Sequence, residues 1–289
     1  MRLRQRLLLL ISIIGCFAFS ADAWSITRTY SSEFMDYQCS IRNQSMWLSG
    51  VALLNGNQLN LYNPALLGVK TEKLFSCYFG NIFWDDFVTS FLLSGSTSTG
   101  VSYGIQLLQV YSPGIEKYLE NDTYLGTFDA TQRYLNLSFT KAFSDTNGVG
   151  LSLGYINENY DTVHYNGFVI NWGFYHYFLD NWMIGGVIDN ITRSKLGKDP
   201  IATRITLGTS YTTEIGSASI EYAYIDNLAQ KMNIGLDFML NQYLSLRIGT
   251  SGQQWRGGVG LTSASLNVDL SFKPHTLGNS YLMSISFIL

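Results

Sequence analysis

The chain has 289 residues, a net charge of −3, and a composition in which only 13% of residues are charged while 15% are aromatic. Soluble domains usually carry about 25% charged residues, and a surface that binds nucleic acid would be basic, so the composition disfavours both classes. No stretch beyond residue 20 is long and apolar enough to form a membrane-spanning helix. Apolar residues are instead interleaved with polar ones, as in the strands of a transmembrane β-barrel.

Residues 1–23 have the form of a bacterial export signal. Three arginines within the first six residues precede an apolar run, and Ala21-Asp22-Ala23 fits a cleavage site. We therefore expect a mature protein that begins near Trp24 and resides in the outer membrane. The alternative is a lipoprotein signal with a lipid on Cys16, but the apolar run continues past that cysteine.

Residues 24–73 lack the period of two that marks strands, yet they are too apolar for a free tail. Residues 45–54 suit a short helix, and Asn63-Pro64 predicts a turn because proline fixes its own φ and favours an extended residue before it. Gly68 permits another turn. We expect an irregular or short-helical plug in the lumen, with Asn63, Pro64, Ala65 and Gly68 as plug or gate residues; a disordered periplasmic leader is the alternative.

Cys39 and Cys77 would both remain in the mature chain. An exported protein can form disulfides, but one of these cysteines lies in the irregular segment and the other in an expected strand. We predict no bond between them.

From residue 74 to residue 289, apolar and polar residues alternate in short runs that are separated by turn residues. Residues 266–272, for example, read Leu-Asn-Val-Asp-Leu-Ser-Phe. Such alternation predicts strands, and we expect an all-β transmembrane antiparallel barrel of about fourteen strands, with twelve or sixteen as alternatives. The expected strands are 74–80, 87–93, 102–110, 134–141, 149–157, 167–177, 182–189, 203–212, 217–225, 231–239, 243–250, 256–262, 265–272 and 280–289.

The connections between these strands fit the asymmetry of outer-membrane barrels, which have long extracellular loops and short periplasmic turns. With a periplasmic N-terminus, the expected outer connections include 111–133, 158–166 and 190–202, whereas 240–242 is a short inner one. A soluble β-sandwich would also alternate, but its outer face would carry charges. Here the polar face consists mostly of Gly, Ser, Asn and Thr.

The last expected strand indicates which face meets lipid. Every odd position from Tyr281 to Leu289 is apolar, whereas Ser284 and Ser286 point to the opposite face. Aromatic side chains near strand ends suit the membrane interface, and the candidates for such girdles are Tyr281, Tyr243, Trp182, Tyr211 and Tyr224.

The hairpin pairing predicts a row of charged side chains across five adjacent strands on the lumen face. Residues that face each other lie symmetrically about the centre of the turn, and opposed unlike charges contribute about 0.2–1 kcal/mol per pair. The row is either a constriction or floor for the plug, or a structural ion network. Its members, each expected to face the next, are Glu221, Asp237, Arg247, Arg256 and Asp269.

The sequence gives little support for an enzyme, and we expect no cofactor. Three dispersed histidines form no metal-ligand cluster. Asp161 and His164, close together in an expected outer loop, are the one acid and histidine pair that an outer-membrane hydrolase would use. Such a pair is more often solvated surface.

Leu59 to Leu67, which reads Leu-Asn-Leu-Tyr-Asn-Pro-Ala-Leu-Leu, resembles the segment that precedes the barrel in the PorV/PorQ branch of the FadL-like outer-membrane family. Residues 126–131, 200–208 and 276–281 are similar to later stretches of that branch, in the same order. The resemblance covers most of the mature chain, but each motif is short and composed of common residues.

The resemblance implies a fourteen-stranded, FadL-like barrel with an N-terminal plug and one of two activities. FadL-type members pass hydrophobic molecules such as fatty acids, whereas PorV-type members serve type IX secretion and bind exported cargo proteins. This chain has little room for large outer loops, which disfavours cargo binding. We expect a non-enzymatic, porin-like barrel in contact with outer-membrane lipids, for passive transport of small hydrophobic molecules, with type IX secretion as the alternative.

Overall fold

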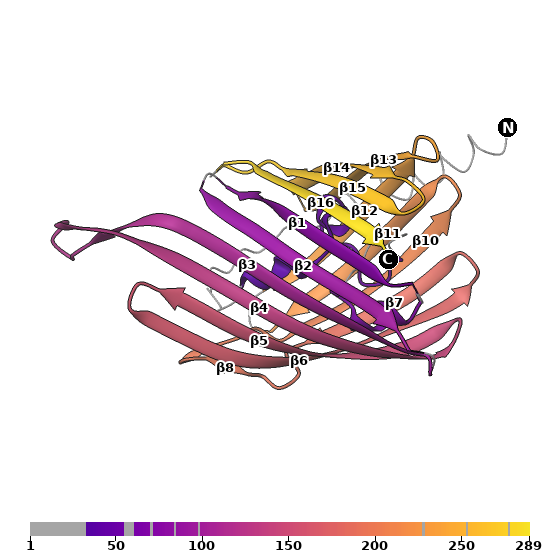
Figure 1. Cartoon of the computed structure of the whole chain (residues 1–289), viewed down its shortest axis with the longest axis horizontal. Helices are drawn as coiled ribbons and strands as arrows, with labels where there is room; N and C mark the ends of the chain where they lie inside the picture. Colours follow the sequence, from indigo (N-terminus) through magenta and orange to yellow (C-terminus); the bar gives the residue numbers. More distant parts are fainter. Residues whose placement is uncertain are drawn as a thin grey trace.

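The computed structural model describes residues 33–54, 61–69, 72–83, 85–97, 99–226, 229–252, 254–276 and 278–289. Within them, fourteen antiparallel strands form one closed barrel, in which the last strand pairs with the first (Figure 1). The expected export signal and Cys16 lie outside the described residues. Among the helices of the described residues, none is long and apolar enough to cross a membrane.

All fourteen expected strands are present, so the predicted fold class is confirmed. The two-stranded sheet β8–β9 lies in the connection between β7 and β10 and is not part of the barrel. The barrel strands are β1 Leu74–Ile82, β2 Asp86–Ser96, β3 Val101–Tyr118, β4 Tyr124–Ser144, β5 Asn147–Tyr160, β6 Val163–Leu179, β7 Trp182–Asp189, β10 Arg204–Thr213, β11 Gly216–Ile225, β12 Ala229–Met239, β13 Leu244–Ser251, β14 Gln254–Thr262, β15 Leu266–Lys273 and β16 Ser280–Ile288, with β8 Lys195–Leu196 and β9 Asp199–Pro200 between them.

The wall has an apolar outer face and a largely polar inner face. In β16, Tyr281 and Phe287 are 53% and 41% exposed, whereas Ser284 and Ser286 are buried inside the barrel. The outward positions of the other strands also carry exposed large apolar residues, such as Phe91 and Phe139. A band of this kind is typical of a barrel that spans a bilayer.

Aromatic rings gather near strand ends on this outer face. Trp182 and Tyr211, on the neighbouring strands β7 and β10, have ring centroids 4.9 Å apart. Tyr224, Tyr243 and Tyr281 are exposed, as residues of an interfacial girdle would be.

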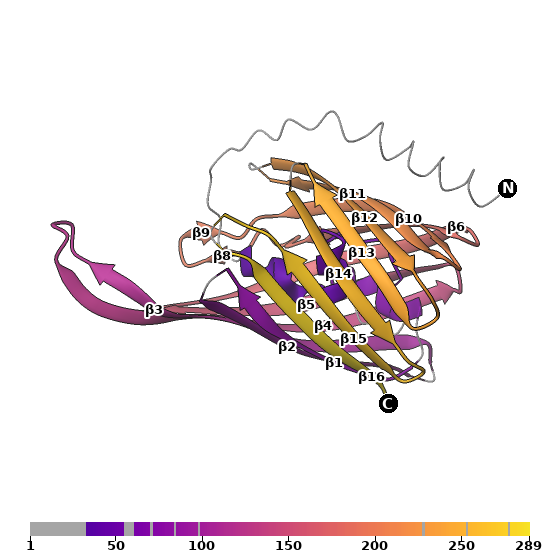
Figure 2. The ribbon, with the colours of Figure 1, turned by 90° about the horizontal axis from the view of Figure 1, so that it is seen from above.

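The two rims of the barrel differ. We call the rim with the β1–β2, β3–β4 and β7–β10 connections the arm end, and the opposite rim the turn end. At the arm end, β3 and β4 run past their neighbours, whose pairing stops at Tyr111 of β3 and Ala130 of β4. The free part of this hairpin, residues 112–129, projects as a two-stranded arm (Figures 1 and 2).

The arm and the neighbouring β5–β6 hairpin correct two of the expected connections. Residues 111–133 and 158–166 are almost entirely strand, with turns only at 119–123 and 161–162, so the prediction of loops there was wrong. A bulge between Ser112 and Ile115, with Gly114 at a φ of 66°, shifts the register. The bulge interrupts the period of two in the side-chain pattern. A strand that projects beyond the wall also buries neither face consistently, so apolar and polar residues do not alternate along it.

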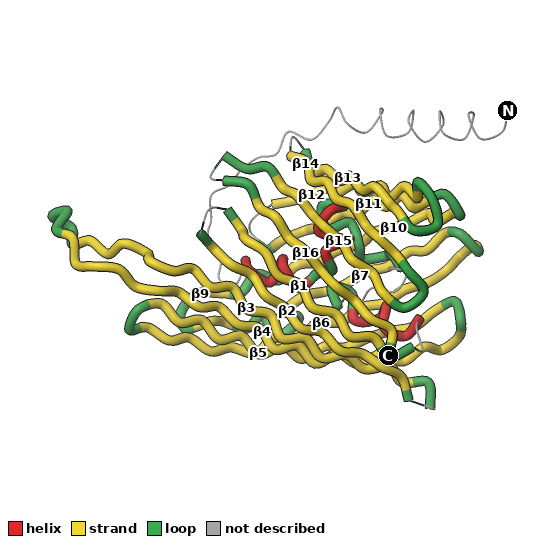
Figure 3. Tube along the Cα trace, turned by 45° about the horizontal axis from the view of Figure 1, so that its top comes forward, coloured by secondary structure: helices red, strands yellow, loops and turns green. Residues whose placement is uncertain are grey.

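The remaining described N-terminal residues, 33–54 and 61–69, form an inner segment that lies inside the barrel (Figure 3). It contains the 3₁₀ helices η1 Glu33–Gln38 and η2 Pro64–Val69 and the helix α2 Ile41–Ser45. The helix expected over 45–54 is therefore displaced towards the N-terminus. Ser40 caps α2 by accepting a hydrogen bond from the Asn43 amide (3.3 Å), and positive φ angles at Trp47 and Leu48 end the helical region.

Glycines of the wall let the inner segment approach closely. At seven inward positions, a Cβ atom would lie only 2.0–2.6 Å from an atom of the inner segment. A side chain at any of them would force the inner segment or the wall to move. These positions, which we call the glycine seat, are Gly150, Gly173, Gly185, Gly208, Gly235, Gly249 and Gly258.

We expect Gly249→Ala to destabilise the barrel, because the added Cβ would lie 2.1 Å from the Met46 carbonyl carbon. Overpacking of this kind costs about 1–3 kcal/mol, measured as the free energy of unfolding in a urea titration of the protein in lipid vesicles. Gly257→Ala is the matched control, because its Cβ would meet nothing closer than 3.6 Å. Equal stability of the two variants would contradict a tight seat.

Candidate functional site

The side chain of Asn63 joins two parts of the inner segment to the wall. Its Oδ1 accepts a hydrogen bond from the Ala65 amide (3.1 Å), while its Nδ2 donates to the carbonyls of Val51 (2.7 Å) and Phe174 (3.0 Å). Pro64 starts η2, where a missing amide hydrogen costs little. The expected turn is thus present at the start of a 3₁₀ helix, and Asn63, just before this helix, is hydrogen-bonded to Phe174 of β6.

Gly68 lets η2 pack against β4. A Cβ at this position would lie 2.6 Å from the Thr140 side chain, and the Thr140 hydroxyl donates a hydrogen bond to the Pro64 carbonyl. The structure therefore brings Asn63, Pro64, Ala65 and Gly68 together on one short helix against β4, β5 and β6.

The five charged residues expected to form one row all have buried side chains inside the barrel. One of the four expected facing pairs is present, Asp237 with Arg247. The other three were wrong: Glu221 faces Asn233. Arg247 faces Gly258, and Asp269 faces Gly260.

The register errors have a common cause. The pairing was predicted from assumed turn centres, and three of those centres lie one or two residues away from their true positions, which shifts the pairing by two or four residues. Because side chains alternate with a period of two, even shifts change a residue's neighbour and keep its face. The charged side chains therefore point inward without forming one row. Among the described residues, two groups of ion pairs are present inside the barrel, and Arg256 belongs to neither.

The first group, which we call the central network, joins the inner segment to β12, β13 and β15. Arg42 of α2 binds Asp237 through Nε (2.7 Å) and Nη2 (2.6 Å) and donates from Nη1 to the Leu54 carbonyl (2.8 Å). Arg247 lies between two carboxylates: its Nε is 3.4 Å from Asp237, and its Nη1 donates to Asp269. Asp237 therefore holds two guanidinium groups, one from the inner segment and one from the wall.

The second group lies around Arg204 of β10. Its Nη1 binds Asp36 of η1 (2.6 Å) and its Nε binds Asp189 of β7 (2.8 Å). Burial would raise the pKa of Asp36, but nearby cations, Arg204 foremost with Lys231 and Arg256, together outweigh burial and hold that pKa below its ordinary value. Asp36 therefore stays ionised and anchors η1 to the wall.

Glu221 binds the inner segment beside this group. It accepts hydrogen bonds from the Tyr62 hydroxyl (2.9 Å) and the Val51 amide (3.1 Å). Burial raises the pKa of Tyr62 well above its ordinary value, so the phenol keeps the proton that it donates. The Arg204 guanidinium also lies 5.1 Å from the centre of the Tyr62 ring.

Arg256 makes its contacts with the inner segment rather than with the other expected members of the row. Its Nη1 donates to the Gln44 side chain, and its guanidinium lies 4.5 Å from the centre of the Trp47 ring. All of these networks thus connect the wall to the inner segment.

Sequence reasoning missed Arg42, Asp36, Asp189 and Arg204. The last two occupy inward positions of β7 and β10, so strand parity alone would have placed them in the lumen. Arg42 and Asp36 lie in the irregular segment, where no period in the sequence indicates direction.

The residues considered for hydrolysis lie at the arm end. Asp161 pairs with Lys117 of the arm, and His164 Nδ1 is 2.7 Å from Asn159 Oδ1. Within the described residues, no group of three or more His, Cys, Asp and Glu side chains is placed to hold a metal ion. Cys39 and Cys77 are both free thiols.

We expect Asp237→Asn to lower the free energy of unfolding by about 3–5 kcal/mol, because it leaves two buried guanidinium groups without their shared charge. Urea titration in lipid vesicles measures the loss. Asp161→Asn removes the half-exposed partner of Lys117 and, as a matched control, should cost only about 0–1 kcal/mol. If Asp237→Asn cost no more than the control, the central network would not hold the inner segment.

No protein-family model and no curated protein matches the chain. Among solved structures, the barrel is similar to the CymD monoaromatic hydrocarbon channel, with a TM-score of 0.62 and 12% identity over 86% of this chain and 96% of that one. It is also similar to the toluene transporter TodX of Pseudomonas putida, with a TM-score of 0.59 and 13% identity over 85% of this chain and 95% of that one. A FadL homologue of Pseudomonas aeruginosa is similar with a TM-score of 0.58 and 8% identity over 86% of this chain and 98% of that one. The chain therefore has the barrel fold of FadL-like channels.

Proposed function

We propose that the protein is an integral outer-membrane barrel that lets small hydrophobic molecules, such as aromatic hydrocarbons or fatty acids, cross by passive diffusion. The observation that carries this proposal is a cluster of apolar wall side chains that point into the lumen near one end of the barrel. The fold, shared with channels for monoaromatic hydrocarbons, supports it.

The apolar zone, which we call the collar, lies inside the arm end. Its side chains come from β1 to β6 and from the connection between β7 and β10, and all of them are buried. A transmembrane barrel needs apolar side chains on its outer face rather than in its lumen, so the collar suits a hydrophobic solute. Its members are Tyr78, Val88, Leu108, Val110, Tyr134, Ile156, Val169, Leu196 and Ile201.

The inner segment fills the collar and would have to yield to a solute. Phe34 of η1 belongs to the same apolar cluster as the collar. The glycine seat contacts residues 45–52 and 63–65, whereas η1 is held by polar contacts that include the ion pair of Asp36 with Arg204. In this proposal Phe34, near the start of η1, is therefore the moving gate, while Asn63, Pro64, Ala65 and Gly68 anchor the rest of the plug.

The test is toluene uptake by bacterial cells that carry an intracellular toluene reporter, with and without this chain in the outer membrane. We expect uptake to rise with the wild-type chain and to fall about tenfold with Leu108→Asn, because an unpaired amide in an apolar path costs about 1–3 kcal/mol.

Leu66→Asn is the matched control for this experiment. Leu66 is also a buried leucine of the lumen, but it lies on η2, outside the collar. The amount of folded barrel is checked for each variant by its mobility on a gel before and after heating. Equal losses in the two variants, or no uptake with the wild-type chain, would refute the proposal.

A second candidate function, service to type IX secretion, is favoured by the arm. The shortness of the chain suggested little room for outer loops, yet the arm projects well beyond the rim. Its end exposes apolar side chains to solvent, each 36–54% accessible: Ile115, Tyr118, Leu119, Tyr124 and Leu125. A surface that binds exported proteins would have this character.

Removal of the arm separates the two candidates. We expect a variant in which residues 113–128 are replaced by a tight turn to keep wild-type toluene uptake, because the collar is intact. Loss of exported proteins from the cell surface, with unchanged uptake, would make secretion the leading function.

A further inference from the structure

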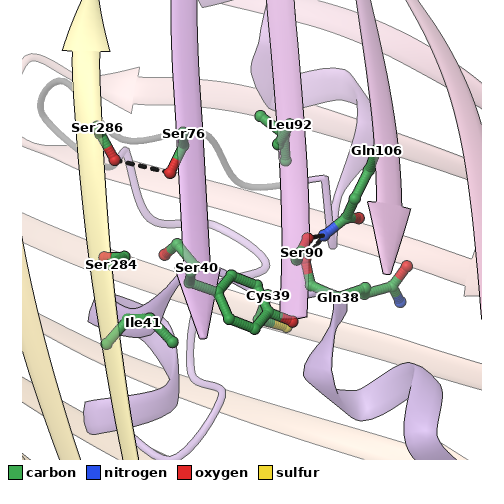
Figure 4. Close-up of a pocket in the computed structure, with 11 residues that line it drawn as sticks. Gln38, Cys39, Ser40, Ile41, Ser76, Ser90, Leu92, Gln106, Ser284 and Ser286 are labelled. Atoms are coloured by element: carbon green, nitrogen blue, oxygen red, sulfur yellow. Dashed lines mark hydrogen bonds between the residues drawn. The ribbon is translucent and has the colours of Figure 1, made fainter. Parts of the chain in front are cut away.

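A small polar cavity lies between the inner segment and strands β16, β1, β2 and β3 (Figure 4). Eleven residues line it, none of them is charged, and several are hydroxyl or amide side chains, such as Gln38, Ser76, Ser90, Gln106 and Ser284. The cavity has a volume of about 10 Å³, which is room for one hydroxyl group.

Some of the polar groups around the cavity bind one another. The hydroxyls of Ser76 and Ser286 are 2.8 Å apart, on the paired strands β1 and β16. The amide nitrogen of Gln106 donates to the Ser90 hydroxyl (3.1 Å) and to the Gln38 carbonyl (3.0 Å). These two hydrogen bonds hold the Gln106 side chain in place and use both hydrogens of its amide nitrogen.

Three other polar side-chain atoms of the residues that line the cavity have no hydrogen-bond partner among the described residues. They are Oε1 of Gln38, Oε1 of Gln106 and Oγ of Ser284, and their residues are only 3%, 1% and 3% exposed. Buried polar atoms are nearly always paired, and an amide oxygen can only accept a hydrogen bond. The cavity is therefore built to receive a donor.

The cavity adjoins the apolar collar. Tyr78 and Ile41 line the cavity and also belong to the apolar cluster of the collar. A molecule with an apolar body in the collar would thus reach these acceptors with one polar group. The absence of a cation among the lining residues disfavours a carboxylate there, because burial of an unpaired charge is costly.

We propose that this cavity binds the hydroxyl group of an uncharged phenol or alcohol whose apolar part lies in the collar. The inference rests on the proposed transport function and adds its substrate class: neutral hydroxylated compounds over plain hydrocarbons and over carboxylates. The hydroxyl donates to an amide oxygen of Gln38 or Gln106, while the ring or chain takes the space that Phe34 fills.

The test compares uptake of three probes of similar shape, 4-methylphenol, toluene and 4-methylbenzoate, by cells that carry the wild-type chain or a variant. We expect the wild-type chain to favour 4-methylphenol. Gln106→Met keeps the size of the side chain and removes its acceptor, so the ratio of 4-methylphenol to toluene uptake should fall about two- to tenfold, the effect of one hydrogen bond.

Asn233→Leu is the matched control, since Asn233 is also buried, has a side-chain oxygen without a partner among the described residues, and lies on β12, which does not line the cavity. It should leave the ratio unchanged, and Ser284→Ala, a smaller change at the cavity, should lower it. Absence of toluene uptake by the wild-type chain would refute the transport function itself. Toluene uptake with a ratio that neither cavity variant alters, or equal uptake of 4-methylbenzoate, would refute the hydroxyl site alone.

Discussion

The backbone of a strand in lipid has no water to satisfy its amide and carbonyl groups, so each strand must pair on both sides. Pairing of β1 with β16 meets this requirement by closing the sheet on itself. Closure in turn fixes the two faces of every strand: one meets lipid, and the other encloses a lumen. The position of the inner segment, the buried charges and the polar cavity all follow from that enclosure.

The enclosed space holds both apolar and charged side chains. The collar lies at the arm end, where Arg204 and Asp189 also lie at the ends of β10 and β7. Arg42 joins α2 to Asp237 of β12. Buried charges need partners, and here most of the partners join wall to segment, as Asp237 and Arg204 do. The same residues that make the lumen polar therefore hold the inner segment in place.

Much of this fold could be predicted from the sequence because side chains of a strand in a barrel wall alternate between the lipid face and the lumen face. Alternation located all fourteen strands and placed all five expected charged side chains on the lumen face. The prediction failed outside the wall. The arm lies beyond the wall, so residues 112–129 have no fixed inner face, and the bulge near Gly114 breaks the period.

The candidate site was predicted only in part, for a related reason. Register depends on turn geometry, which the alternation does not specify, so Glu221 and Arg256 were assigned the wrong neighbours. The inner segment has no period at all. Its contacts through Arg42, Asp36 and Asn63 depend on where the whole barrel places each wall residue, and that information is not local in the sequence.

The glycine seat also limits which N-terminal segments this barrel wall can accommodate. Each seat glycine leaves room for particular atoms of the inner segment, as Gly173 does for the Asn63 side chain and Gly235 does for the Ser49 hydroxyl. An inner segment of different shape would clash with wall side chains at some positions and leave unfilled space beside the glycines at others. The segment and the wall must therefore change together during evolution, and a chimera that combines this wall with the N-terminal segment of a distant barrel should not assemble.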